Sequence, residues 1–465
     1  MNLPHRLLRL AAVQAAVLGG LWGASLAPAH AAAGDMSFDF ANSHPYLGFG
    51  TQVWLNNKDT SAASKMLRDL NARYVRVSLT PKILLNQLKP DLTVEQASAL
   101  IKANDSAEQR QRFSAFRDQM KALNIEPVLI FWRMPEPWVE TKSKKAGSKS
   151  QSNYAKPEFF DAYANVMVAQ MLYSTQLGIA PVAVELTNEP HGAWATKFSD
   201  EEYAMLAQKA RATMDRYGLQ KIRIAGPGAN LKNFDHFIGG LKARNALGTI
   251  GFASAHVYTT PDKLADSRLD DVGSFVGRGK FGPVMITEFN VKGDDEDSPL
   301  VSEKRDNATP GFGLAAGADA ILLIGHGASA LIYWQLQDFN WQKRSLGMIS
   351  DSGERRPVAQ VMQALFSPLP RGGKAVGTRT GVPNLYATAL QEGDKTYLML
   401  ANLSDKPQAV NASFKGGTDH CGAVERVTGY AMNGDPASAL KGASARACQF
   451  QATMAPGSAA TVVLR

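Results

Sequence analysis

The segment Val182-Ala-Val-Glu-Leu-Thr-Asn-Glu-Pro190 begins as a short, β-branched apolar run and ends abruptly in polar residues. A run of this length is typical of a buried strand in a parallel sheet, which we expect over Val182–Leu186. The polar end, Asn188-Glu189-Pro190, would then project from the carboxyl edge of that sheet. The sequence on both sides repeats this arrangement, so the segment is one unit of a larger pattern.

Seven further apolar runs alternate with longer amphipathic stretches between Tyr46 and Leu336. Two of the helical stretches begin with a capping-box pattern, Thr93-x-x-Gln96 and Ser199-x-x-Glu202. Eight strand–helix units predict an α/β fold, a (β/α)₈ TIM barrel with loop insertions. In chain order, the expected strands are Tyr46–Trp54, Tyr74–Leu79, Glu126–Trp132, Val182–Leu186, Lys221–Ala225, Gly251–Tyr258, Pro283–Phe289 and Ala330–Leu336.

The pattern changes at Phe366-Ser-Pro-Leu-Pro-Arg-Gly-Gly-Lys374, where prolines and glycines mark a domain boundary. Beyond it, apolar residues recur at every second position, as in Thr396-Tyr-Leu-Met-Leu-Ala-Asn402. We therefore expect the barrel over residues 32–369 and a small antiparallel β-sandwich over residues 370–465. The two cysteines, Cys421 and Cys448, both lie in the second domain. We expect a disulfide between them, because no His or Cys clusters there at the spacing of a metal site.

Residues 1–31 have the pattern of a secretory signal peptide. Arg6 and Arg9 precede an apolar run, Leu10–Leu26, which ends in Ala29-His30-Ala31, a small-residue cleavage site. We expect this segment to be removed and the mature protein to be secreted or periplasmic, with no membrane span. The formal net charge of +8 in 465 residues comes from scattered residues without a nucleic-acid-binding motif. We therefore expect no nucleic-acid partner, and we expect a monomer.

Two glutamates follow strands on opposite sides of the expected barrel. Glu189 comes after the fourth strand, and Glu288 closes the seventh within Ile286-Thr-Glu-Phe-Asn290. Because the carboxyl ends of all barrel strands meet at one face, both carboxylates would face the same opening. That geometry suits acid–base and nucleophilic chemistry on a bond held between them. Taken singly, either glutamate could equally be a neighbour of a helix N-terminus or a surface ion pair.

Polar residues at the other strand ends favour a site. Arg76 lies on the second strand, and beside a buried carboxylate it would hold that group ionised. His256 and Tyr258 lie two residues apart on the sixth strand, so both would face the mouth of the barrel. Taken alone, Arg76 could be an ion pair of the barrel wall and His256 a satisfied core histidine.

The tryptophans of the mature chain gather at the ends of the expected strands, and none lies in the second domain. Flat apolar rings with a polar edge around one opening favour a carbohydrate cleft over coincident core packing. These residues are Trp54, Trp132, Trp138, Trp194, Trp334 and Trp341.

These residues together resemble the glycoside hydrolase clan A barrels. The segments Val184-Glu-Leu-Thr-Asn-Glu-Pro-His-Gly192 and Val284-Met-Ile-Thr-Glu-Phe289 are most similar in sequence to the motifs of family 5. The chain departs from family 5 at Phe131-Trp132-Arg133, where that family usually has a histidine after the third strand. The β-rich second domain is more like families 30, 39 and 51.

The resemblance implies a role for each matching residue. Glu189 would be the acid/base, Glu288 the nucleophile and Asn188 a partner of the substrate 2-hydroxyl group. The other implied roles are contacts with the nucleophile for Arg76 and Tyr258, lining of the site for His256, and a platform under the reacting sugar for Trp334. From their placement alone, Trp54, Trp132, Trp138 and Trp194 are expected to bind further sugar units.

The resemblance predicts a retaining glycoside hydrolase of the endo-β-glucanase or mannanase type, with a β-linked polysaccharide or oligosaccharide as substrate. Glu189, kept protonated by its environment, would donate to the leaving oxygen while Glu288 attacks the anomeric carbon. The chemistry requires no metal and no organic cofactor. A non-catalytic carbohydrate-binding barrel and a transglycosylase with the same residues stay open as alternatives.

Two charged segments follow strands on the same face of the expected barrel. The loop between Thr141 and Ser152 is rich in lysine, from Lys142 to Lys149, and could bind an acidic polysaccharide or simply be solvated. The acidic run Asp294–Asp297 could pair with those lysines or bind a calcium ion. The sequence leaves both questions open.

Overall fold

A computed structural model of the chain describes residues 35–55, 60–79, 83–143, 151–192, 195–267, 283–291, 308–338, 346–378, 380–417 and 421–465. The expected signal peptide, residues 1–31, lies outside the described residues.

Eight parallel strands form a closed barrel, which confirms the predicted fold class. Each strand pairs in parallel with the next around the ring, and the last pairs with the first. In order around the barrel, the strands are β3 (Gly48–Val53), β4 (Tyr74–Val77), β5 (Glu126–Ile130), β8 (Ala183–Glu185), β10 (Arg223–Asn230), β11 (Ile250–Thr259), β12 (Val284–Val291) and β13 (Ala328–Tyr333).

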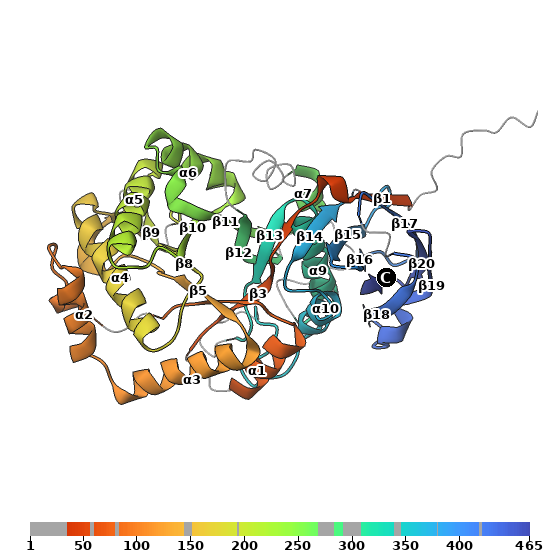
Figure 1. Cartoon of the computed structure of the whole chain (residues 1–465), viewed down its shortest axis with the longest axis horizontal. Helices are drawn as coiled ribbons and strands as arrows, with labels where there is room; N and C mark the ends of the chain where they lie inside the picture. The colour runs from red at the N-terminus through yellow and green to blue at the C-terminus, as the bar shows by residue number, and fades with distance from the viewer. Residues whose placement is uncertain are drawn as a thin grey trace, which may run out of the picture.

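Helices follow the strands and surround the barrel (Figure 1). Both predicted capping boxes are present: Thr93 accepts from the backbone N–H of Gln96, and Ser199 accepts from that of Glu202. The helices are α1 (Thr60–Asp69), α2 (Val94–Ala103), α3 (Ala107–Leu123), α4 (Phe160–Gln176), α5 (Asp200–Arg216), α6 (Leu231–Ala243), α7 (Pro261–Ser267), α9 (Pro310–Gly325) and α10 (Pro357–Phe366).

Side chains fill the inside of the barrel, so it is a packed core and not a pore. One apolar cluster includes Tyr74, Val128, Phe252 and Met285 from four of the strands. These residues precede the polar strand ends along the chain, which leaves the carboxyl face of the barrel for the polar groups.

The C-terminal part forms two β-sheets packed around a second apolar core. One sheet has the order β18-β21-β16-β15-β14-β2, and the other has the order β1-β17-β20-β19, where β1 is Asp35–Asp39 and β2 is His44–Tyr46. Figure 1 shows this β-domain (blue) beside α9 and α10 of the barrel. Its C-terminal strands are β14 (Gly373–Gly377), β15 (Leu385–Glu392), β16 (Lys395–Asn402), β17 (Gln408–Lys415), β18 (Val424–Ala431), β19 (Leu440–Arg446), β20 (Gln449–Met454) and β21 (Ser458–Leu464).

The first strands of the described chain belong to the β-domain, although the sequence predicts the barrel from residue 32 onward. Strand β1 (Asp35–Asp39) pairs in parallel with β17, and β2 (His44–Tyr46) pairs with β14. The reason is apolar burial: Phe38 is fully buried and stacks on Phe414, with ring centres 5.5 Å apart. The chain therefore enters the barrel only at Gly48.

Cys421 and Cys448 form the expected disulfide, with Cα atoms 4.6 Å apart. Cys421 precedes β18 in one sheet and Cys448 precedes β20 in the other, so the bond ties the two sheets together. Among the described residues, no helix combines the length and the apolar character needed to cross a membrane.

Candidate active site

Polar side chains from β4, β8, β11 and β12 meet at the carboxyl face, with Arg76 on β4. Glu288 lies on β12, His256 and Tyr258 lie on the neighbouring strand β11, and Glu189 follows β8 across the mouth. His256 and Glu288 are direct partners in the β11–β12 register, where a bulge at Ala255/His256 shifts the pairing. The structure therefore brings both predicted glutamates to one site.

Both oxygens of Glu288 have partners. Arg76 Nη1, from β4, lies 2.6 Å from Oε1, and the Tyr258 hydroxyl donates to Oε2 over 2.7 Å. Glu288 is only 4% exposed, so its charge is held by these two donors and not by bulk water. These two contacts hold the Glu288 carboxylate in one position and orientation.

The backbone of Glu189 is held in an uncommon conformation, with φ at +41°. For a residue with a side chain this left-handed conformation costs on the order of 1 kcal/mol, and such residues cluster at functional sites. Neighbouring hydrogen bonds fix the turn: Asn188 N–H donates to the Trp132 carbonyl, and Gly192 N–H donates to the Glu189 carbonyl. The turn presents the Glu189 carboxylate to the barrel mouth.

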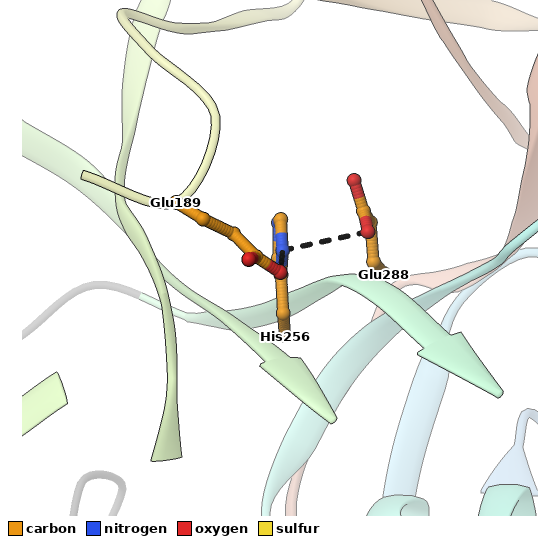
Figure 2. A group of neighbouring side chains, drawn as sticks. All are labelled: Glu189, His256 and Glu288. Carbon is orange, nitrogen blue, oxygen red and sulfur yellow. Dashed lines mark hydrogen bonds and ion pairs between the residues drawn. The ribbon is translucent and has the colours of Figure 1, made fainter. Parts of the chain in front are cut away.

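His256 lies between the two glutamates (Figure 2). Its Nδ1 is 2.8 Å from Glu189 Oε1 and 3.5 Å from Glu288 Oε2. One ligand atom from each of the three side chains lies within 4.8 Å of the others, so the two glutamates approach to that distance. This upper bound on one oxygen–oxygen distance lies below the roughly 6.5 Å at which inverting glycosidases begin, and it favours the roughly 5–5.5 Å spacing of retaining ones.

The same three atoms could hold a metal ion. However, the Arg76 guanidinium already lies 2.6 Å from Glu288, and a second cation beside it would be repelled. The histidine nitrogen that faces both glutamates is hydrogen-bonded to Glu189. This donor set therefore suits proton exchange better than metal binding.

The charges in the site shift the pKa values of His256 and Glu189 in opposite directions. Burial lowers the pKa of His256, but Glu288, Glu189 and Glu185 outweigh burial and leave that pKa above its usual value. Burial raises the pKa of Glu189, yet the hydrogen bond and charge of His256 leave that pKa below its usual value. The expectation that its surroundings keep Glu189 protonated is therefore not met by the site as it stands. The imidazole of His256, whose pKa is raised, lies 2.8 Å from this carboxylate.

Arg76 is fully buried and connects several predicted residues. Besides Glu288, its guanidinium contacts Asn188 Oδ1 at 3.0 Å, Gln52 Oε1 at 3.1 Å and Glu185 Oε2 at 2.5 Å. The sequence alone predicts no role for Gln52 or Glu185. A polar residue inside an otherwise apolar strand was the available signal for both.

Three of the predicted tryptophans form one aromatic wall of the site. Trp54 and Trp132 stack with ring centres 5.3 Å apart, and Trp334 meets both edge-on at 5.7 and 5.6 Å. The Arg76 guanidinium lies 5.2 Å from the Trp132 ring centre, which joins this wall to the carboxylate network. All three side chains are partly exposed and can contact a ligand.

Open space adjoins this wall. A cavity of about 340 Å³ lies beside Trp54 and Trp132 and reaches Ser78 and the first turns of α3. Its size is in the range of small-ligand pockets.

Trp138 does not join the wall. It is 1% exposed and stacks on Phe159, with Tyr163 of α4 meeting it edge-on. The short turn Glu136–Trp138 directs the ring into the helix layer, so its expected role as a sugar platform is wrong. Trp194 and Trp341 lie outside the described residues.

The lysine-rich segment begins in a small sheet at the mouth, β6 (Val139–Ser143), β7 (Gln151–Ala155) and β9 (Thr196–Lys197). Lys142 and Lys197 lie over the Tyr154 ring, 5.4 and 5.3 Å from its centre. Burial lowers the pKa of His191 against the opposing charge of Glu189, and His256 and, least, Lys197 lower it further. Residues 144–150 and the acidic run Asp294–Asp297 lie outside the described residues.

No protein-family model and no curated protein matches the sequence. Solved structures do match. An endoxylanase of glycoside hydrolase family 30 from Clostridium papyrosolvens C71 is 16% identical with a TM-score of 0.70, over 93% of this chain and 100% of that chain. A family 30 subfamily 8 xylanase from Clostridium acetobutylicum is 16% identical with a TM-score of 0.68, over 92% and 99%.

A family 51 arabinofuranosidase from Xanthomonas axonopodis pv. citri also matches, at 14% identity and a TM-score of 0.60, over 93% of this chain and 99% of that chain. The likeness spans both the barrel and the β-domain of the chain. It confirms the resemblance to clan A glycoside hydrolases at the level of the fold, and it includes families 30 and 51, to which the β-domain pointed.

Proposed function

We propose that the protein is a retaining glycoside hydrolase that cleaves β-glycosidic bonds of a polysaccharide or oligosaccharide. The observation that carries the proposal is the pair of buried glutamates within 4.8 Å of each other on the carboxyl face of the barrel. The shared fold with xylanases and an arabinofuranosidase supports it as analogy, since one fold can host many activities.

In the proposed mechanism, a Glu288 oxygen attacks the anomeric carbon while the bond to the leaving oxygen breaks. Glu189 gives its proton to that oxygen, having taken it from His256 across their 2.8 Å contact. Arg76 and the Tyr258 hydroxyl hold Glu288 in line for the attack. Burial and the charge of Glu288 raise the pKa of Tyr258 well above its usual value, so Tyr258 stays a donor throughout.

In the second half of the reaction, a water molecule replaces the leaving group. Glu189, now ionised, takes a proton from the water as it attacks the anomeric carbon, and the bond to Glu288 breaks. The product keeps the configuration of the substrate. Asn188, fixed by Arg76, is positioned for the sugar 2-hydroxyl group.

The aromatic wall of Trp54, Trp132 and Trp334 supports a carbohydrate substrate with more than one bound sugar. The cavity beside Trp54 and Trp132 extends the site away from the glutamates, which favours endo action on a chain. The activity we propose is of the endo-β-glucanase or mannanase type. The similar structures are named for other sugars, xylan and arabinofuranosides, so an assay on several polysaccharides must identify the substrate.

We also propose that the protein acts outside the cytoplasm. The signal pattern of residues 1–31 and the Cys421–Cys448 disulfide support export, because disulfides persist in oxidising compartments.

A panel of neutral and acidic β-linked polysaccharides, assayed for new reducing ends, tests the proposal. The wild-type chain should act on at least one of them, and Glu189→Ala should not. Glu126→Gln is the matched control, because Glu126 pairs with Arg73 at the start of β5, away from the site. Binding without any cleavage would favour the non-catalytic barrel, and longer products with an added oligosaccharide acceptor would favour a transglycosylase.

A further inference from the structure

A third carboxylate, Glu185, lies inside the barrel beneath the two proposed catalytic glutamates. It is 1% exposed, and both of its oxygens are bonded. Arg76 Nε is 2.5 Å from Oε2, while Thr287 and Ser254 donate their hydroxyls to Oε1 over 2.6 and 3.2 Å. His256 Nε2 lies 3.9 Å from Oε1. Glu185 thus contacts residues on β4, β11 and β12.

The barrel leaves room for this carboxylate at Gly228 of β10. A Cβ atom there would lie 2.9 Å from Glu185 Oε1 and 3.7 Å from His256 Nε2. The backbone of Gly228 has φ at +66°, which glycine adopts without strain. Glu185 therefore occupies a shaped position and is not a polar residue tolerated at random in the core.

The contacts of Arg76 show what Glu185 can control. A guanidinium is a rigid planar fork, so fixing Nε fixes the directions of both Nη groups. With Nε held by Glu185, Nη1 points at Glu288 and Nη2 points at Asn188. One buried carboxylate thereby sets the angle from which Arg76 meets the nucleophile and the proposed binder of the 2-hydroxyl.

We propose that Glu185 is a positioning residue of the reaction, which acts through Arg76 on Glu288 and Asn188 and through charge on His256. The inference rests on the proposed function. It predicts that loss of Glu185 reduces the stabilisation of the transition state more than it reduces the affinity for substrate. A merely structural ion pair would instead change stability and leave kcat and its pH profile unaltered.

The test is Glu185→Gln, which keeps the shape of the side chain and removes its charge. We expect kcat to fall at least about tenfold with KM within about twofold of wild type. The alkaline limb of the kcat profile should move to lower pH, because a negative charge that favours protonated His256 is gone. Glu126→Gln, which removes a half-buried carboxylate that also pairs with an arginine, should match wild type in all three readouts.

A double-mutant cycle tests whether Glu185 acts on the reaction through Arg76. If Glu185 acts through Arg76, then Glu185→Gln should cost clearly less kcat in an Arg76→Lys background than in wild type, because lysine has no fork to orient. Full additivity of the two changes would overturn the route through Arg76.

Thr287→Val gives an independent reading should Glu185→Gln fail to fold. It removes the 2.6 Å bond to Glu185 without changing any charge, and kcat should fall about threefold or more. A folded Glu185→Gln or Thr287→Val protein with wild-type kcat and pH profile would overturn the inference. Wild type that cleaves no glycoside would overturn the proposed function instead, so the two failures are distinguishable.

Discussion

His256 Nδ1 lies 2.8 Å from the Glu189 carboxylate, inside the barrel mouth and away from bulk water. The contact couples the titration of the two residues, so they behave as one unit. The pKa directions agree with this picture, since that of His256 is raised and that of Glu189 is lowered. This coupling supports the proposal that Glu189 takes the proton it donates from His256.

This unit gives a prediction for the pH profile. The wild-type enzyme needs the shared proton, so kcat should decline only as pH rises through the raised pKa of His256, above its usual value of 6.5. In His256→Ala, Glu189 must hold the proton alone. Its pKa should rise from the lowered value, because burial remains and the hydrogen bond is lost, yet stay below that of His256.

The alkaline limb of His256→Ala should therefore lie at lower pH than that of wild type, with the maximum kcat reduced about 10²-fold. Initial rates from pH 4 to pH 10 measure both. An alkaline limb at the wild-type position would show that the proton does not come from this pair.

The buried and the exposed tryptophans should respond differently to substitution. Trp132→Ala removes a partly exposed ring from the aromatic wall, so KM should rise about tenfold with little change in Tm. Trp138→Phe alters a ring that is packed in the helix layer, so it should lower Tm and leave KM unchanged. Steady-state kinetics and thermal melts of both variants measure KM and Tm. A raised KM in Trp138→Phe would contradict the position of Trp138 in the helix layer.

The lysines beside the mouth predict a preference for acidic glycans. Lys142 and Lys197 flank Tyr154, and Lys197 acts electrostatically on His191 close to Glu189. We expect an acidic β-linked polysaccharide to bind about two- to fivefold more tightly than its carboxyl-reduced form at low salt, and the difference to vanish at high salt.

The double change Lys142→Gln, Lys197→Gln should abolish that difference. Lys395→Gln, in the β-domain and paired with Glu425, should preserve it. Calorimetry with the inactive Glu189→Ala protein makes the comparison. Equal binding of the native and the reduced polymer would show that these lysines serve only the small sheet.

The disulfide should affect stability and not chemistry. Cys421→Ser removes a link across 27 residues between the two sheets of the β-domain, so the free energy of unfolding should fall by about 2–4 kcal/mol. The barrel site is built from other elements, and kcat at 25 °C should be unchanged. A denaturant titration and an activity assay on the same preparation test this, and a loss of kcat in the folded variant would be the contrary result.

Much of the barrel could be predicted because its strands are short apolar runs that stand apart from amphipathic helices. The same pattern identified the strand ends, and Glu189, Arg76, His256 and Glu288 meet as expected. The direction of a side chain leaving an irregular turn has no such signature. Trp138 therefore could not be distinguished from Trp132 in the sequence, although one is buried and the other faces the mouth.

The pairing of strands that lie far apart in the chain could not be predicted from the sequence either. Strand β1 finds its partner near Asn411, more than 370 residues along the chain, and no local pattern encodes that choice. The part played by Glu185 likewise depends on which strands become neighbours, since its partners come from β4, β11 and β12. The sequence reports that a charge lies in an apolar strand, and only the fold reports what it touches.

The most direct test of the two-glutamate mechanism is the configuration of the first product. Proton NMR of an early hydrolysis mixture distinguishes the two anomers before they interconvert. Because the carboxylates approach within 4.8 Å, the account predicts retention, with the β-anomer formed first from a β-linked substrate. Initial release of the α-anomer would mean inversion and would contradict Glu288 as the nucleophile.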